Sequence, residues 1–187
     1  RGIVTEIERD RVGLAQEIFD AVGTEAERTT SFEYNAFGQV TREVNWNGHA
    51  TTYDYFRTGP STGYLRQVVV DPDGLALTTR YETDPRGNVT AVVDPRQIRH
   101  ERLYNEVDWR VETTRGASSS NDGAPALRYV TSYLYDRNGN VEELRRPFGD
   151  DGADFTSDRF GYGTLDELLE VRREIAPGGG ETVETYE

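Results

Sequence analysis

The sequence of 187 residues contains no cysteine, no methionine and no lysine. Without cysteine the chain has no disulfide framework and no cysteine-ligated metal site, and the redox compartment stays open. No segment is long and apolar enough to cross a membrane or to act as a signal peptide. The missing lysine has two explanations, a GC-rich genome that favours arginine codons or adaptation to salt, and neither identifies a ligand.

Positive charge and aliphatic side chains are also scarce. Asp and Glu number 34 against 21 basic residues, so the net charge is −13. Electrostatic binding of nucleic acid needs clustered cations on the phosphates, so no nucleic-acid partner is expected. Hydrophobic residues make up 35% of the chain, which fits a thin β-layer better than a thick core.

What the chain does contain is a recurring aromatic frame: an aromatic residue, one spacer, Tyr, a polar residue, two spacers, a turn residue, one spacer, then Val or Leu. Residues 32–40 and 133–141 match each other position for position, and 81–89 and 160–168 match with departures. Weaker copies lie at residues 53–55, at 104–105 and at the end of the chain. The signature residues are Phe32, Tyr34, Gly38, Val40, Tyr53, Tyr55, Tyr81, Asp84, Gly87, Val89, Tyr104, Tyr133, Tyr135, Asp136, Gly139, Val141, Phe160 and Tyr162.

A second turn follows each frame by about eight residues. Its clearest example contains Asp71, Pro72 and Gly74, and others lie at 45–48, 94–97, 146–149 and 176–179. The unit is therefore strand, turn, strand, turn. The step from Tyr34 to Tyr55 is 21 residues, and longer steps elsewhere place insertions at turns. A period in this range indicates stacked supersecondary units.

The physics of the unit predicts an all-β fold of antiparallel hairpins. Residues i and i+2 share one face of a strand, so Phe32 with Tyr34 presents two rings to the same side. Aromatic and β-branched residues suit a half-buried pleated surface, and Asn or Asp followed by Gly suits tight hairpin turns. A single hairpin is marginal in water, so neighbouring units must cover the aromatic faces.

The residues at 135–141, 34–40 and 83–89 resemble the YD-repeat family, also called RHS repeats, whose consensus has Tyr-Asp, a Gly or Asn turn and a following hydrophobic residue. The resemblance covers roughly residues 30–187. It departs where Asp108 and Asp166 replace the turn glycine and Thr83 replaces the tyrosine. We interpret those copies as decayed or bulged.

The resemblance implies a segment of a spiralling β-sheet shell, as in RHS toxins, insecticidal toxin complexes and teneurin-like proteins. Such a segment is non-catalytic, needs no cofactor, and is secreted or at the cell surface. Its partners are the remaining repeats of the same or an associated polypeptide and an enclosed cargo such as a toxin domain. The alternative is an extracellular adhesion module that binds a glycan or a protein ligand.

For the domain organisation we expect a degenerate or partial repeat over residues 1–31 and about six repeats over 32–187, together a fragment of a larger array. The opening residues align with 86–90, so the sequence starts in mid-repeat. Residues 14–22 form one short helix or a strand pair, and strands are favoured because residues 20–23 then serve as a turn. Loops are expected at 118–125, 149–158 and 177–180.

Few side chains suggest chemistry. His49 and His100 are interpreted as exposed strand or turn residues rather than a metal pair or a general base. The serines at 118–120 have no partnered histidine in the sequence. The carboxylates of Asp150, Asp151, Asp154 and Asp158 suggest calcium, but the EF-hand spacing is not met and a solvated acidic loop is favoured.

Two further hypotheses concern the repeats themselves. In RHS proteins that carry a toxin, a motif related to Asp71-Pro72-Asp73-Gly74-Leu75 lies near an autoproteolytic site; here the turn recurs at Asp94-Pro95, so an ordinary repeat turn is favoured. The aromatic ladder could stack on sugar rings, but in a chain with few aliphatic residues we favour rings that hold the array together.

Overall fold

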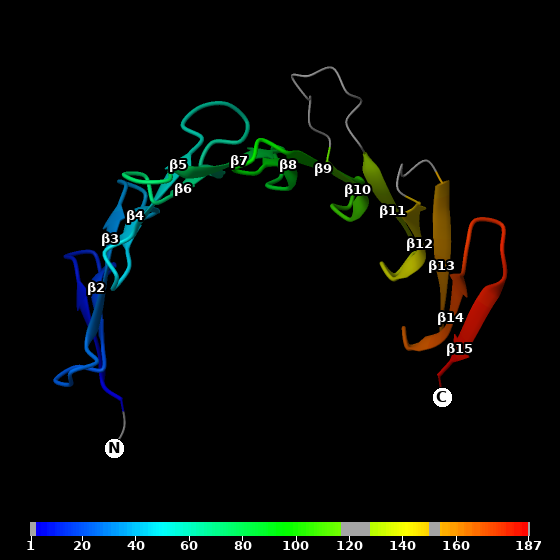
Figure 1. Ribbon diagram of the computed structural model, residues 1–187, viewed down its shortest axis with the longest axis horizontal. Helices are drawn as coiled ribbons and strands as arrows, with labels where there is room; N and C mark the ends of the chain where they lie inside the picture. Colours follow the sequence, from blue (N-terminus) through cyan, green and yellow to red (C-terminus); the bar gives the residue numbers. More distant parts are fainter. Residues whose placement is uncertain (1–2, 117–127, 150–153, 187) are drawn as a thin grey trace. The chain divides into compact units, whose positions relative to one another are not determined.

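The structure, a computed structural model, describes residues 3–116, 128–149 and 154–186, and every regular element in them is a β-strand (Figure 1). The loop expected at 118–125 lies outside these residues. The strands follow one another in chain order in a single sheet, in which β1 and β15 are the terminal strands. The predicted all-β fold is confirmed.

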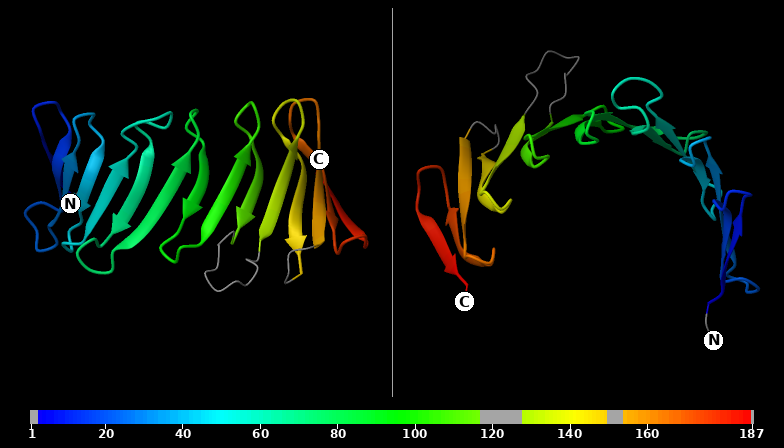
Figure 2. Two further views of the ribbon diagram at one scale, coloured as in Figure 1. Left: turned by 90° about the horizontal axis from the view of Figure 1, so that it is seen from above. Right: turned by 180° about the vertical axis from the view of Figure 1, so that it is seen from behind.

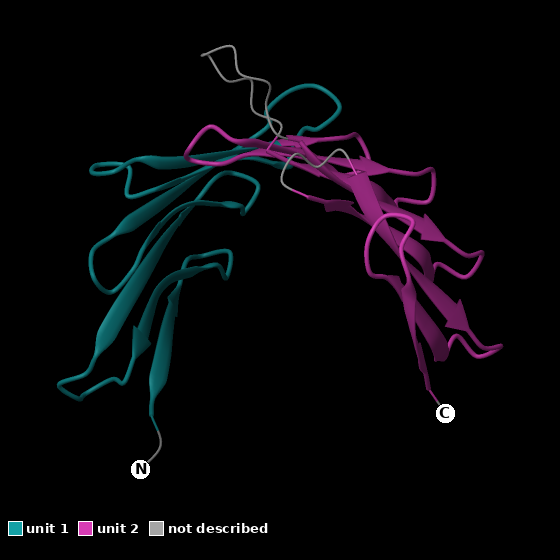
Figure 3. Cartoon of the chain, turned by 45° about the vertical axis from the view of Figure 1, so that its right-hand side comes forward, with its two compact units in different colours: residues 1–81 teal, residues 82–187 magenta. Residues whose placement is uncertain are grey.

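The chain divides into two compact units, residues 1–81 and 82–187, which are described separately (Figure 3). The strands of the first are β1 (Thr5–Arg9), β2 (Ala15–Asp20), β3 (Arg28–Tyr34), β4 (Val40–Val44), β5 (Ala50–Tyr55), β6 (Leu65–Val70) and most of β7 (Leu77–Thr83). The second contains β8 (Val89–Val93), β9 (Arg99–Tyr104), β10 (Arg110–Arg115), β11 (Tyr129–Tyr135), β12 (Val141–Phe148), β13 (Asp154–Tyr162), β14 (Leu168–Glu174) and β15 (Glu181–Thr185).

Within each unit, successive strands pair antiparallel and the turns alternate between the two edges of the sheet (Figure 2). These edges are the two rows of turns at the ends of the strands, and not the outermost strands β1 and β15. We call the row of turns that follow odd-numbered strands the odd edge, and the row at the opposite strand ends the even edge. Residues 14–22 contain β2 and no helix, so the favoured strand interpretation is confirmed. The positive φ of Ala21, 57°, lies in the turn expected there.

The sequence-based boundaries are wrong at one connection. Residues 146–148 were expected in a turn and 154–158 in a loop, but the former end β12 and the latter begin β13. The two strands pair from Glu143 opposite Arg159 to Phe148 opposite Asp154. Strand pairing continues through this charged stretch, and the guanidinium of Arg146 pairs with the buried carboxylate of Asp158 across the two strands.

The frame tyrosines sit at β-bulges, which explains the Val or Leu that ends each frame. The register shifts between Glu33 and Tyr34, and Tyr34 then lies opposite Val40. The same shift places Tyr55 opposite Leu65, Tyr135 opposite Val141 and Tyr162 opposite Leu168. An aromatic ring opposite a branched aliphatic residue is a stabilising cross-strand pair.

The core is thin. Among the described residues the buried hydrophobic side chains are Ala50, Ala91 and Val171, and most other apolar side chains are half-buried. The aromatic rings of the frame belong to this half-buried class. The sheet therefore depends on contacts between neighbouring strands and turns rather than on a central core.

Candidate functional site

The odd edge carries most of the signature residues. Five-residue turns close it: the N–H of the first residue donates to the carbonyl of the fifth, and the N–H of the fourth donates to the carbonyl of the first. In the turn 136–140 these bonds run from Asp136 to Asn140 at 2.9 Å and from Gly139 to Asp136 at 3.3 Å. The turns at 35–39, 84–88, 105–109 and 163–167 have the same pattern.

The polar residue after the frame tyrosine has a defined role in these turns. The Oδ1 atom of Asp136 accepts the backbone N–H groups of Asn138 and Asn140, both at 2.9 Å. Asn35, Asp84 and Asn105 accept the equivalent pair of N–H groups in their own turns. The side chain thus satisfies two donors that a tight turn would otherwise leave to solvent.

These bonds lower the pKa of Asp136 below its ordinary value, because the side-chain amide of Asn140 and then the turn N–H groups donate to the ionised carboxylate. A depressed folded-state pKa contributes stability above the unfolded pKa of about 4, and this contribution is lost as the pH falls through the folded pKa.

We therefore expect Asp136→Asn to keep its turn at pH 7, since asparagine fills this position elsewhere, and to flatten the loss of stability below about pH 4. Urea unfolding followed at several pH values measures this. Asp154→Asn, which removes an exposed carboxylate at the start of β13, is the control for the loss of one surface charge. A wild-type acid profile in Asp136→Asn would contradict the assignment.

The fourth turn position requires a positive φ. Gly139 has 96° and Gly38 has 78°, and Asp108 and Asp166 both adopt 63°. The turns at Asp108 and Asp166 therefore keep the full five-residue geometry. This finding replaces the interpretation of these two copies as decayed; the β-bulge at Tyr162 in the Asp166 copy is the one that Tyr34 and Tyr135 also have.

Asp108 and Asp166 connect their turns to the preceding turn of the odd edge. The Oδ1 atom of Asp166 accepts the side-chain amides of Asn138 at 2.7 Å and Asn140 at 2.9 Å. Asp108 in the same way accepts from Asn88 at 2.6 Å and pairs with Arg86 at 3.0 Å. Aspartate tolerates a left-handed backbone better than most residues, and here it adds a contact that glycine cannot make.

Apolar contacts join other neighbouring turns. The indole of Trp109, the fifth residue of its turn, lies 5.2 Å from the Tyr135 ring, centroid to centroid, with the planes tilted by 46°. A Cβ atom at Gly139 would lie 2.8 Å from the indole, so this glycine is required by close approach as well as by its φ. Leu14, the fifth residue of the turn 10–14, has the equivalent place beside Gly38: a Cβ atom added at Gly38 would lie 3.6 Å from its Cδ1 atom.

The frame tyrosines connect strands through their hydroxyl groups. Each donates to the backbone carbonyl of the first residue of the preceding strand: Tyr34 to Ala15 (2.6 Å), Tyr55 to Val40 (2.8 Å), Tyr104 to Val89 (3.1 Å), Tyr135 to Arg110 (2.7 Å) and Tyr162 to Val141 (3.1 Å). Burial raises the pKa of Tyr55 above its ordinary value. The rings are half-buried, so these tyrosines act as clamps between strands.

We expect Tyr34→Phe to destabilise the chain by about 1 kcal/mol, because one hydrogen bond is lost and the Ala15 carbonyl loses its donor. Denaturant unfolding measures the change. Tyr64→Phe, in the same unit, is the matched control, because the partly exposed Tyr64 lies outside the five clamps. Equal effects of the two substitutions would contradict the clamp role of the Tyr34 hydroxyl.

The remaining candidate residues do not form a catalytic or metal site in the described part of the chain. His49 is exposed in the turn 45–49, and His100 is half-buried in β9. Within residues 3–116, 128–149 and 154–186, no group of three or more His, Cys, Asp or Glu side chains is placed to hold a metal ion. Asp154 is exposed, but Asp158 is 5% exposed and paired with Arg146, so it is not the solvated residue expected; Asp150 and Asp151 lie outside the described residues.

The turn that contains Asp71 joins β6 and β7 and is closed by its own bonds. The Asp71 carbonyl accepts the N–H groups of Gly74 at 3.1 Å and Ala76 at 2.8 Å, and its side chain accepts that of Leu75 at 3.0 Å. Pro72 and the positive φ of Asp71, 54°, set its direction. Autoproteolysis at this turn remains an untested hypothesis.

The comparisons with known proteins give structures but no sequence family. No family model and no curated protein matches the chain. Its fold resembles chains in the crystal structures of TcdB2-TccC3-Cdc42 and of TcdB2-TccC3 without the hypervariable C-terminal region, each with a TM-score of 0.62, 19% identity and 99% of this chain covered. The Photorhabdus luminescens Tc holotoxin pore matches with a TM-score of 0.62, 20% identity and 99% coverage.

This chain spans 12% of the length of those neighbours. At this identity the likeness shows a shared fold. Insecticidal toxin complexes are among the proteins to which the YD-repeat resemblance pointed, and at the level of fold that resemblance is confirmed. In the described residues there is no helix with the length and apolarity needed to cross a lipid bilayer.

Proposed function

We propose that this chain is a non-catalytic segment of a repeat shell that encloses a cargo such as a toxin domain. The observation that carries the proposal is the use of the signature residues. The frame tyrosines and turn carboxylates bond to backbone and side-chain groups of their own or neighbouring strands and turns. They are engaged in holding strands together, as a wall requires. The fold likeness to Tc toxin structures supports the same conclusion.

The shell function implies further repeats on both sides. β1 and β15 each have one neighbour among the described strands, and every residue of both is exposed. Exposed edges favour pairing with further strands. We keep residues 1–31 as a degenerate or partial repeat and 32–187 as about six repeats of a larger array as parts of the proposal, together with a secreted or cell-surface location.

Protease protection tests enclosure in the complete polypeptide that contains this array. The segment proposed as cargo is identified by mass spectrometry after limited digestion under native conditions and compared with the same segment expressed alone. Enclosure predicts that the cargo is cleaved at least about tenfold more slowly inside the complete protein, because proteases act on accessible, unfolded segments. Equal cleavage rates would rule out enclosure.

A glycan or protein ligand bound by the array is the second candidate. The observation that favours it is a hollow of about 680 Å³ whose lining includes the rings of Tyr53 and Tyr55, surfaces on which a sugar ring or an apolar side chain of a protein could pack. Binding of a labelled glycan panel, lost in Tyr53→Ala and kept in Tyr64→Ala, would support this alternative. It would assign the array an adhesive role whether or not it encloses a cargo.

A further inference from the structure

The connection between β5 and β6 differs from every five-residue turn of the odd edge. The bonds from the Phe56 N–H to the Tyr64 carbonyl (3.0 Å) and from the Gly63 N–H to the Phe56 carbonyl (2.8 Å) are those of a five-residue turn. The loop 56–64 is therefore the same turn with four residues inserted between its first and fourth positions. Phe56 also occupies the first position, where the other turns have Asp, Asn or Gly.

The insertion creates a hollow of about 680 Å³ between this loop and the turn 35–39. Aromatic side chains of Phe37, Tyr53, Tyr55 and Phe56 line it. Phe37, the third residue of its turn, is 89% exposed. Covering an exposed ring beside an aromatic hollow with an apolar group removes apolar surface from water, which is favourable.

Most polar groups around the hollow are already engaged. The Tyr55 hydroxyl donates to the Val40 carbonyl, Tyr53 to Glu43, Gln39 to the Gly63 carbonyl and Thr62 to the Gly59 carbonyl, at 2.6 to 3.1 Å. A sugar would need several free hydrogen-bonding partners for its hydroxyl groups. The ring surfaces are what remains available, so the hollow suits an apolar side chain of a protein better than a sugar.

The same chain presents such a side chain at another odd-edge turn. Leu165, the third residue of the turn 163–167, is 86% exposed and is followed by Asp166 and Glu167. Asp166 accepts hydrogen bonds from Asn138 and Asn140, and Glu167 accepts one from the Leu165 N–H at 2.8 Å, but within the described part of the chain neither carboxylate is neutralised by an ion pair. Val107 occupies the equivalent position, but its neighbour Asp108 is paired with Arg86.

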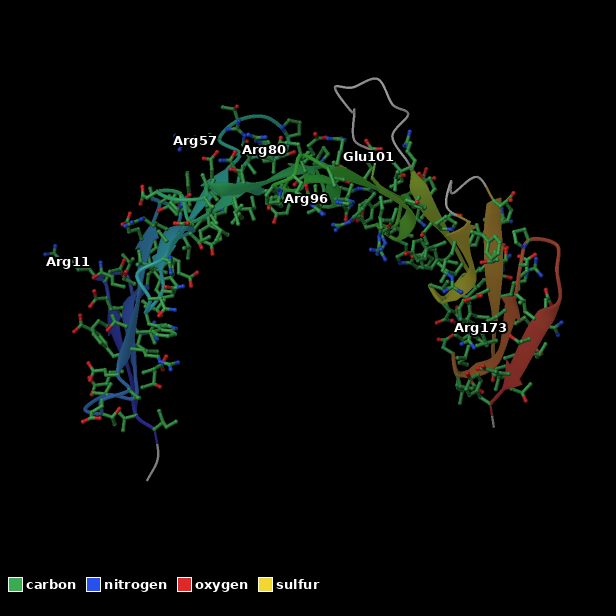
Figure 4. All side chains as sticks on the ribbon, viewed as in Figure 1. Arg11, Arg57, Arg80, Arg96, Glu101 and Arg173 are labelled. Carbon is green, nitrogen blue, oxygen red and sulfur yellow. The ribbon has the colours of Figure 1, made fainter. Side chains whose placement is uncertain are left out.

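The charge beside the hollow is complementary to the Leu165 turn. Arg57, in the inserted loop, has a side chain that is 88% exposed and projects from the loop (Figure 4). Its ion pair with Asp54, at 3.6 Å on the surface, is weak. The guanidinium is thus free to meet a second carboxylate when an acidic turn approaches.

We propose that the hollow is a docking site for the Leu165 turn of a second copy of this chain. Leu165 covers the rings of Phe37 and Phe56, and Asp166 and Glu167 face Arg57. One copy offers one hollow and one turn, so the contact joins two different surfaces. This inference goes beyond the shell proposal and does not depend on an enclosed cargo.

Sedimentation of the 187-residue chain over a range of concentrations tests the contact. We expect reversible self-association that weakens as salt is added. Leu165→Asp and Phe37→Asp should each raise the dissociation constant at least about tenfold, because each removes apolar burial at the contact. Both side chains are exposed, so neither substitution should disturb folding. Leu75→Asp, at a 76% exposed leucine in an even-edge turn, is the matched control and should change nothing.

Mixing decides whether the contact is the proposed one. Leu165→Asp keeps its hollow and Phe37→Asp keeps its turn, so an equimolar mixture should recover dimers that neither variant forms alone. A wild-type chain that stays monomeric, equal weakening by Leu165→Asp and Leu75→Asp, or a mixture without dimers would each overturn the proposal. The wild-type chain would stay monomeric if the Leu165 turn docked in the hollow of its own molecule, or if the hollow bound a different natural partner.

Discussion

Gly139→Ala should destabilise the second unit by about 3 kcal/mol. Two costs combine at this position. The backbone has a φ of 96°, where an L-residue with a Cβ atom loses roughly 1–2 kcal/mol. The added Cβ would also lie 2.8 Å from Cζ2 of Trp109, and forcing it there displaces the indole at a cost of about 1–3 kcal/mol.

The controls separate the two costs. Gly48→Ala has a φ of 80° and nothing within 4 Å of its added Cβ, so it should cost only about 1 kcal/mol. The double variant Gly139→Ala/Trp109→Ala should be destabilised by less than the sum of the two single variants. Without the indole, the Cβ atom added at position 139 has no ring to clash with. Hydrogen exchange of the β10, β11 and β12 amides measures the local effect, as repeat arrays need not unfold in one step. Equal costs at Gly48 and Gly139 would show that Trp109 does not constrain the turn.

Arg146→Ala should destabilise the same unit by about 2–3 kcal/mol. Nη2 of Arg146 lies 2.5 Å from Oδ2 of Asp158, a residue that is 5% exposed. The other carboxylate oxygen, Oδ1, is buried without a hydrogen-bond partner among the described residues. Removal of the arginine leaves a buried negative charge without its partner; the cost is below that of a fully buried pair because Arg146 is half-exposed.

Neutralising both partners should recover most of this loss. Arg146→Leu combined with Asp158→Leu replaces the ion pair by apolar contact beside Leu144, which lies opposite Asp158. Arg173→Ala is the matched control, since this arginine is equally exposed but its partner Glu184 is at the surface, so the substitution should cost much less than Arg146→Ala. Urea unfolding measures all three. A double variant no more stable than Arg146→Ala would show that the charge of Asp158 is not the cause.

The sequence was sufficient for the strands and for most of the turns. Period-two aromatics and Asn/Asp-x-x-Gly spacing are local signals, and the strands around Tyr34 and Tyr135 were expected from them. The connection 146–158 was not, because proline, glycine and aspartate suggest a turn locally. The pairing of Arg146 with Asp158 across two strands overrides that signal and is visible only once the register is known.

The role of the signature residues was only partly predictable. That the rings hold the array together was favoured from composition, but the destination of each hydroxyl depends on a bulge that places the tyrosine beside the preceding strand. Asp166 is a clearer case. Because an aspartate stands where other copies have the turn glycine, the sequence suggested a decayed repeat. Its role as hydrogen-bond acceptor for Asn138 and Asn140 becomes visible only when the two turns are seen side by side. A fifth-position asparagine followed, one turn later, by a fourth-position aspartate is the sequence signal for this contact.

The central claim is that this array is one stretch of a continuous wall. An electron cryomicroscopy reconstruction of the complete polypeptide tests it most directly. The account predicts that β1 and β15 each pair with a further antiparallel strand, that the tyrosine clamps recur in the added repeats, and that the wall surrounds polypeptide density. Terminal strands left unpaired or capped by another domain, with no enclosed density, would contradict it.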